Sequence, residues 1–62
     1  MSVKRRDLIK YLEENGFYLL REGANHSIYT NKKKTIPVKR HRKIDNITAN
    51  ELCKQAGLNP KF

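Results

Sequence analysis

His26 is the residue of this chain best suited to chemistry at cellular pH, because an imidazole readily takes up and releases a proton. It follows a Gly23–Asn25 turn and opens a strand-like run in a chain with a formal net charge of +8. RNA supplies its own nucleophile, the 2′-hydroxyl group. A histidine that moves one proton, beside cations that stabilise the phosphorane, would make a minimal ribonuclease. The alternative is that His26 is an ordinary polar residue beside a turn, or a phosphate ligand.

Half of the lysine and arginine residues lie in one basic segment, residues 32–43, which contains no acidic residue. Lysine and arginine outnumber aspartate and glutamate by 14 to 6. Such a run can be a solvated surface, but in a 62-residue chain it forms a large share of the surface, so we expect it to bind phosphates. The residues expected to draw in RNA are Lys32, Lys33, Lys34, Lys39, Arg40, Arg42 and Lys43, with Arg21 as a phosphate contact near His26.

The other reactive side chains favour no second chemistry. His41 suits either a two-histidine acid–base pair or a basic loop, and its spacing does not place it beside His26. The two histidines, one cysteine and scattered carboxylates lack the clustered spacing of a metal site, so we expect neither metal nor cofactor. Cys53 has no partner for an intrachain disulfide, and we interpret it as core packing rather than as a nucleophile.

Length and hydropathy limit the class of protein. The longest apolar run, Phe17–Leu20, is far too short to span a membrane. No apolar segment follows the basic N-terminus as in a signal peptide, so we expect a cytoplasmic protein. Hydrophobic residues make up 37% of the chain, which is more than a disordered basic tail carries. We therefore expect a single folded domain over residues 1–62.

Turn and cap signals predict a helix, three strands and a second helix. Ser2 is the predicted N-cap of a helix over residues 3–15, and Gly16 ends it. Strands are predicted over residues 17–22, 26–30 and 35–39, joined by short links into an antiparallel meander. Pro37 cannot donate a ladder hydrogen bond, which predicts an edge strand or a bulge.

The second helix carries the clearest local signal. Thr48 and Glu51 have the spacing of a capping box, and Ile47 and Leu52 that of a hydrophobic staple. Gly57 and Leu58 then predict a Schellman-type end. The simplest architecture is α+β, with both helices on one face of a three-stranded antiparallel sheet.

These residues also resemble a known family. The resemblance rests on Gly16-Phe17, on Arg21 with His26-x-x-Tyr29, on Ile36-Pro37-Val38 and on Lys54-Gln55-Ala56-Gly57-Leu58. Over about residues 4–58 the chain resembles the HicA family of bacterial type II toxins. That resemblance implies a fold like the double-stranded-RNA-binding domain, used as a metal-independent mRNA endonuclease. It also implies a HicB-like antitoxin partner and a catalytic role for His26. Family members commonly carry Gly-Ser before this histidine, whereas this chain has Ala24-Asn25.

The expected function is therefore that of an mRNA-cleaving toxin with His26 as general acid or base. The alternative is a non-catalytic module that binds double-stranded RNA by its shape. A protein-interaction adaptor without a nucleic-acid ligand is a third class, which the charge disfavours. Cleavage that disappears with His26→Ala separates the first class from the others.

Overall fold

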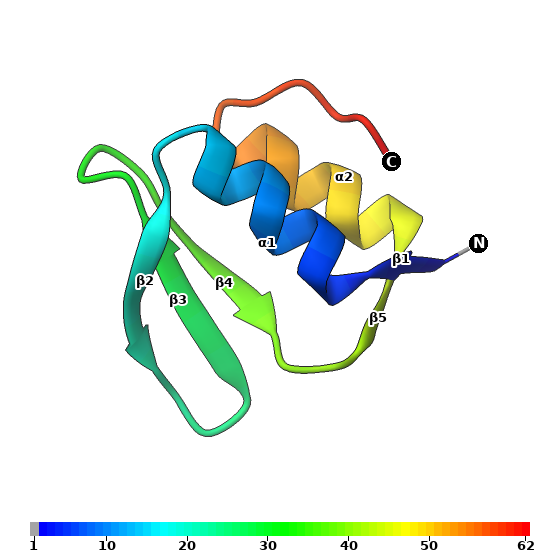
Figure 1. Cartoon of the computed structure of the whole chain (residues 1–62), viewed down its shortest axis with the longest axis horizontal. Coiled ribbons are helices and arrows are strands. Elements are labelled where there is room, and N and C mark those ends of the chain that lie inside the picture. The colour runs from blue at the N-terminus through cyan, green and yellow to red at the C-terminus, as the bar shows by residue number, and fades with distance from the viewer. Residues whose placement is uncertain (1) are drawn as a thin grey trace.

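Two helices lie side by side on one face of a three-stranded antiparallel sheet in the computed structural model, which describes residues 2–62 (Figure 1). This confirms the α+β prediction. The elements are β1 (Ser2–Lys4), α1 (Arg5–Glu14), β2 (Tyr18–Glu22), β3 (His26–Thr30), β4 (Thr35–Lys39), β5 (Lys43–Asp45) and α2 (Asn46–Gln55). None of the helices in this part of the chain has the length and apolarity that crossing a membrane requires.

The predicted start of the first helix is wrong. Ser2–Lys4 is extended and pairs antiparallel with Lys43–Asp45, and Lys4 occupies the N-cap position without a side-chain cap hydrogen bond. The reason is an apolar cross-strand pair: Val3 lies opposite the buried Ile44 and packs against the core. Burial of these side chains outweighs the helix-capping preference of Ser2, because cap preferences are worth only about 1 kcal/mol.

Both helices end as their glycines predict. Gly16 has φ +87° and Gly57 has φ +77°, a conformation that glycine adopts without steric cost. The amide of Phe17 donates to the carbonyl of Leu12 at 3.0 Å, and that of Leu58 to the carbonyl of Cys53 at 2.8 Å. These are the long hydrogen bonds of two Schellman motifs.

The predicted capping box of the second helix is wrong. Helix α2 begins at Asn46, and its N-cap is Asp45. The Asp45 carboxylate accepts hydrogen bonds from the amides of Ile47 at 3.0 Å and Thr48 at 3.4 Å. Ile47 is 68% exposed, so it forms no hydrophobic staple. An aspartate at the positive end of the helix dipole stabilises the helix more than a threonine cap one turn further along would.

The sheet order is β2-β3-β4, so Pro37 lies on an edge strand as predicted. In β4 the side chains of Ile36 and Val38 point into the core, while Thr35, Pro37 and Lys39 are exposed. In β3 Ser27 and Tyr29 are buried on the same inner face. Leu8 and Leu12 of α1, and Ala49, Leu52 and Cys53 of α2, complete the core.

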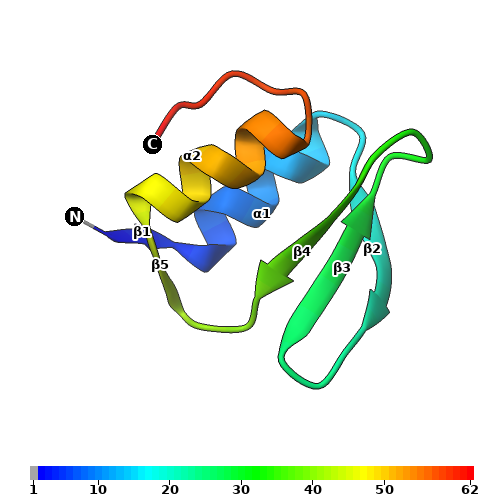
Figure 2. The ribbon, with the colours of Figure 1, turned by 180° about the vertical axis from the view of Figure 1, so that it is seen from behind.

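The C-terminal segment returns over the helices (Figure 2). The Tyr11 hydroxyl donates to the carbonyl of Asn59 at 2.9 Å, and the amide of Phe62 donates to the Asn50 side chain at 2.9 Å. The rings of Tyr11 and Phe62 meet edge to face with centroids 5.9 Å apart. These contacts cover the side of the helices that is turned away from the sheet.

Candidate active site

His26 is the first residue of β3, and its side chain is exposed on the sheet face away from the core. The amide of Gly23 donates to the carbonyl of His26 at 2.7 Å and closes the turn before it. Lys39 is its direct cross-strand partner. Directly opposed residues of an antiparallel pair have Cβ atoms about 5 Å apart. The pairing therefore puts the Lys39 side chain beside that of His26.

His26 lines a surface hollow of about 460 Å³. It is lined by Ala24, Asn25, His26, Lys39, Arg40 and His41. The structure thus brings the two histidines of the chain to one hollow, which their spacing did not predict. The signal was the hairpin register: once His26 pairs with Lys39, His41 follows two residues beyond the end of the strand. We call this the histidine hollow.

A bulge in β2 decides which side chains face His26. The pairing shifts by one residue between Leu19 and Arg21. Without that shift, Arg21 would pair with the inward-facing Ser27 and Glu22 with His26. With it, Arg21 pairs with Ile28, on the same outer face as His26, and Glu22 pairs with Ser27. The bulge therefore puts a cation on the face of the histidine and turns a carboxylate away from it.

A polar network lies directly behind the histidine hollow. The fully buried Ser27 hydroxyl accepts a hydrogen bond from Arg5 Nη2 at 2.8 Å and donates one to Glu22 Oε1 at 2.9 Å. Arg5 Nε donates to the carbonyl of Lys39 at 2.9 Å, and Arg40 Nη2 lies 3.5 Å from Glu22 Oε2. The network joins the first turn of α1 to the strand ends that carry the hollow. Sequence reasoning missed it, and the only signal was the inward position of Ser27 in the strand alternation.

The basic residues predicted from the sequence fall into two groups. Lys39 and Arg40 line the histidine hollow, and Arg42 and Lys43 lie in the segment just after it. Lys32, Lys33 and Lys34 form the β3–β4 turn at the other end of the hairpin, about 13 Å away along the strand at ~3.3 Å per residue. The Asn31 side chain holds that turn by accepting from the amides of Lys33 and Lys34.

The remaining reactive groups do not add to this site. Among residues 2–62, no three His, Cys, Asp or Glu side chains are grouped so that they could hold a metal ion. Cys53 is buried in the core, and burial raises the pKa of its thiol. A neutral, inaccessible thiol suits packing rather than nucleophilic attack.

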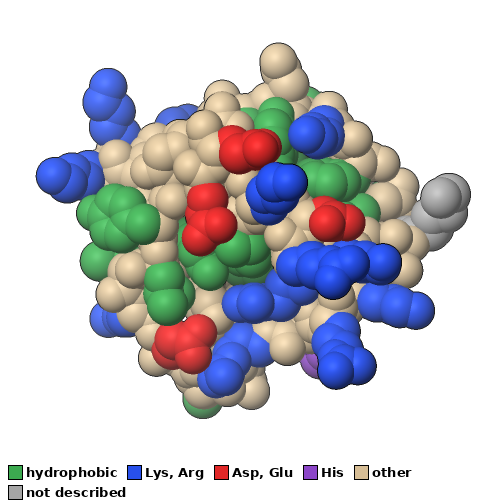
Figure 3. All heavy atoms as spheres, in the orientation of Figure 1, with side chains coloured by type: hydrophobic (Ala, Val, Ile, Leu, Met, Phe, Trp, Pro, Cys, Tyr) green, Lys and Arg blue, Asp and Glu red, His purple; other side chains and the backbone are tan. Residues whose placement is uncertain are grey.

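Figure 3 shows lysine and arginine side chains gathered over the start of α1 and the β1–β5 pair, with a histidine at their margin. This arrangement combines an exposed imidazole, flanking cations and a fold in which the helices support the opposite sheet face. It can bind a phosphodiester and move a proton at it.

Comparison with known proteins assigns the chain to a family. The model of the family described as HicA toxin of bacterial toxin-antitoxin matches residues 5–58, most of the 62-residue chain. No curated protein and no solved structure gives a significant match. The match begins at Arg5, in the network behind the histidine hollow, and ends at Leu58, in the Schellman motif of α2. The chain therefore belongs to the HicA family, the toxins of bacterial toxin–antitoxin pairs.

Proposed function

We propose that this toxin is a metal-independent endoribonuclease that cleaves mRNA with His26 as its catalytic histidine. The observation that carries the proposal is the histidine hollow, which the exposed imidazole of His26 lines together with Lys39 and Arg40. The Glu22 side chain lies on the other sheet face, where it accepts a hydrogen bond from Ser27. Family membership supports a toxin, and the hollow supplies the chemistry by which such a toxin would act on RNA.

The proposed reaction is transesterification within the RNA strand. As a general base, His26 takes the proton of a 2′-hydroxyl group while its oxygen attacks the adjacent phosphorus. The bond from phosphorus to the 5′-oxygen breaks, and that oxygen leaves with a proton from solvent or an acid. The products are a 2′,3′-cyclic phosphate and a 5′-hydroxyl end. General acid–base help of this kind contributes about 10²–10⁴-fold to the rate.

The cations around His26 act on charge that develops during attack. The phosphorane carries more negative charge on its oxygens than the ground-state phosphodiester. The Lys39 ammonium and the Arg40 guanidinium, which line the same hollow, would stabilise that added charge. Arg21, on the same sheet face, would contact a neighbouring phosphate, and the Lys32–Lys34 turn would attract RNA at long range.

The antitoxin would act by covering the histidine hollow. We propose a HicB-like partner that presents carboxylates to Lys39 and Arg40 and excludes RNA from His26. Charge complementarity of this kind speeds association and is weakened by salt. If the partner encoded nearby bound the toxin but left cleavage of RNA undiminished, occlusion of this hollow would be the wrong mechanism.

The test compares the native chain with His26→Ala, matched by circular dichroism, on a structured mRNA in the presence of EDTA. We expect cleavage by the native chain, cyclic-phosphate ends, no cleavage of DNA of the same sequence and no cleavage by the variant. His26→Ala should still bind RNA, because the flanking cations remain.

Equal binding of RNA by both proteins with no cleavage by either would overturn the enzyme and leave a non-catalytic RNA-binding module. Cleavage by the native chain that survives in His26→Ala would assign the chemistry to another residue.

A further inference from the structure

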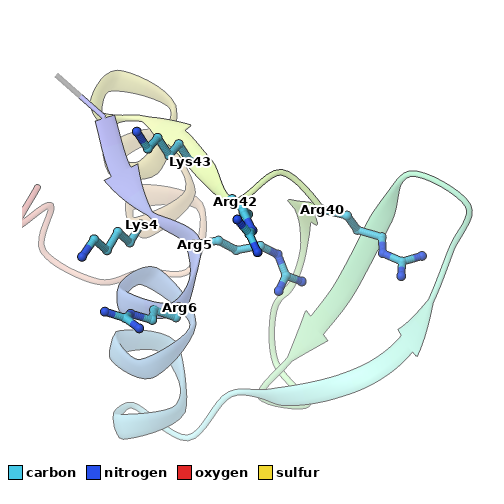
Figure 4. A pocket seen from close by; sticks show the side chains of 6 residues that line it. All are labelled: Lys4, Arg5, Arg6, Arg40, Arg42 and Lys43. Carbon is cyan, nitrogen blue, oxygen red and sulfur yellow. The ribbon is translucent and has the colours of Figure 1, made fainter.

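A second hollow, of about 530 Å³, lies beside the start of α1. Every residue that lines it is a cation: Lys4, Arg5, Arg6, Arg40, Arg42 and Lys43. We call it the six-cation hollow. Figure 4 shows that its side chains come from β1, the first turn of α1, the β4–β5 link and β5, with Arg5 reaching toward the strands. Segments far apart in the sequence thus build one concentrated positive site.

Without a bound anion, the arrangement of these charges lowers the stability of the protein locally. Lys4 and Lys43 are direct cross-strand partners, and like charges in that position repel. Arg5 and Arg6 open α1, where cations oppose the helix dipole. Within residues 2–62, Arg40 alone of the six has a carboxylate within 4.0 Å. An anion in the hollow would relieve each of these unfavourable placements.

Arg40 lines both hollows, which makes them neighbours. A phosphodiester strand with one phosphate in the histidine hollow could therefore put its next phosphates among these cations. Arginine suits this ligand, because its planar fork donates two parallel hydrogen bonds to phosphate oxygens. Among residues 2–62, the guanidinium groups of Arg6 and Arg42 have no carboxylate within 4.0 Å. Arg5, by contrast, is held by Ser27 and the carbonyl of Lys39.

We propose that the six-cation hollow is a subsite for the RNA backbone, occupied by phosphates adjacent to the one that undergoes cleavage beside His26. This rests on the proposed function for its choice of ligand. The strand then runs from His26 over Arg40 toward α1 and the β1–β5 pair, away from the Lys32–Lys34 turn. Lys4 and Arg6 become phosphate ligands, although both lie outside the basic segment of residues 32–43.

The experiment compares two triple variants with the same loss of charge, both made in a non-cleaving His26→Ala background. One is Lys4→Gln, Arg6→Gln and Lys43→Gln, in the six-cation hollow. The other is Lys32→Gln, Lys33→Gln and Lys34→Gln, at the far end of the hairpin. Arg5 and Arg40 stay unchanged, because both hold the network around Ser27 and Glu22.

The measurement is the affinity for a labelled single-stranded RNA oligonucleotide as a function of salt. Each phosphate contact contributes about 0.7 to the slope of log K against log salt for a single strand. Loss of three contacts should therefore lower the slope by about 2 in the hollow variant. The slope of the turn variant should fall by less than half as much, because Lys32–Lys34 attract RNA at long range without direct phosphate contacts.

A thermal melt of the free proteins separates binding from folding. Removing the opposed Lys4–Lys43 pair and a cation from the first turn of α1 should leave the melting temperature equal or raise it. Weaker RNA binding by a protein of undiminished stability supports a subsite.

Equal slopes for the two triple variants would overturn the subsite and leave diffuse electrostatic attraction. A hollow variant with the slope of its parent would also overturn it. Cleavage by the chain with His26 intact is scored separately. If the two variants differ in slope but the chain with His26 does not cleave RNA, the proposed enzyme is refuted and the subsite stands. If that chain cleaves RNA but the two slopes are equal, the subsite is refuted and the enzyme stands.

Discussion

Ser27 links α1 to the strands behind the histidine hollow, and its replacement by alanine should show how much that link stabilises the fold. Ser27→Ala removes the hydrogen bond from Arg5 Nη2 and the one to Glu22 Oε1, at 2.8 and 2.9 Å. Each bond to a charged group is worth about 1.5–3 kcal/mol net. Arg5 and Glu22 can recover part of this from water or from each other, so we expect a loss of about 2 kcal/mol.

That loss is large for a chain of this size. At about 0.05–0.15 kcal/mol per residue, a 62-residue domain has only ~3–9 kcal/mol of stability. A change of 1 kcal/mol shifts the melting temperature of such a domain by about 4–8 °C, so Ser27→Ala should lower it by ~8–16 °C. Urea unfolding, analysed at constant m-value, measures the free energy directly.

The matched control is Ser2→Ala, which makes the same chemical change at an exposed position of β1, where the hydroxyl has no hydrogen bond to any other of residues 2–62. Its effect should stay within about 0.5 kcal/mol. A double-mutant cycle of Ser27→Ala with Arg5→Gln should then give a coupling energy above about 0.5 kcal/mol. If Ser27→Ala cost no more than Ser2→Ala, the network would not be what holds α1 to the strand ends.

Three further results should follow from the geometry. Asp45→Ala should cost about 1 kcal/mol of unfolding free energy and Thr48→Ala less than about 0.5 kcal/mol, measured in urea, because Asp45 supplies the cap. The stability that Cys53 gives over Cys53→Ala should be fully present below about pH 8.5, where the unfolded thiol ionises. It should decline above that pH, because burial raises the pKa of the folded thiol. His41→Ala should lower RNA cleavage by less than about tenfold. A loss of ~10²–10⁴-fold, as general acid–base catalysis contributes, would instead make His26 and His41 a catalytic pair.

Local chemistry explains why much of the fold could be predicted. The predicted strands over residues 26–30 and 35–39 coincide with β3 and β4, because alternation and polar turns bound them on both sides. Gly16 and Gly57 predicted the helix ends, since a left-handed residue there suits glycine. The starts of both helices were wrong because N-cap signals of similar strength compete within a few residues, and packing chooses among them.

The candidate site also has a part that the sequence predicts and a part that it does not. The position of His26 at the start of a strand follows from the residues around it, and its catalytic role stays a prediction. The residues that lie near His26 in the folded chain cannot be predicted from its neighbours in the sequence. His41 reaches the histidine hollow through the β3–β4 register, and Glu22 is turned from it by a bulge that no local signal marked.

The sequence by itself determined the order of the two helices and the three-stranded meander, the basic character and the strand that begins with His26, because these depend on residues close together in the chain. Only the tertiary structure decided the β1–β5 pair, the Arg5–Ser27–Glu22 network and the six-cation hollow. Arg5 and Ser27 are 22 residues apart in the chain, and Lys4 precedes the meander whereas its partner Lys43 follows it. Contacts at such separations form only when burial of the core fixes where α1 lies against the sheet, so no local pattern encodes them.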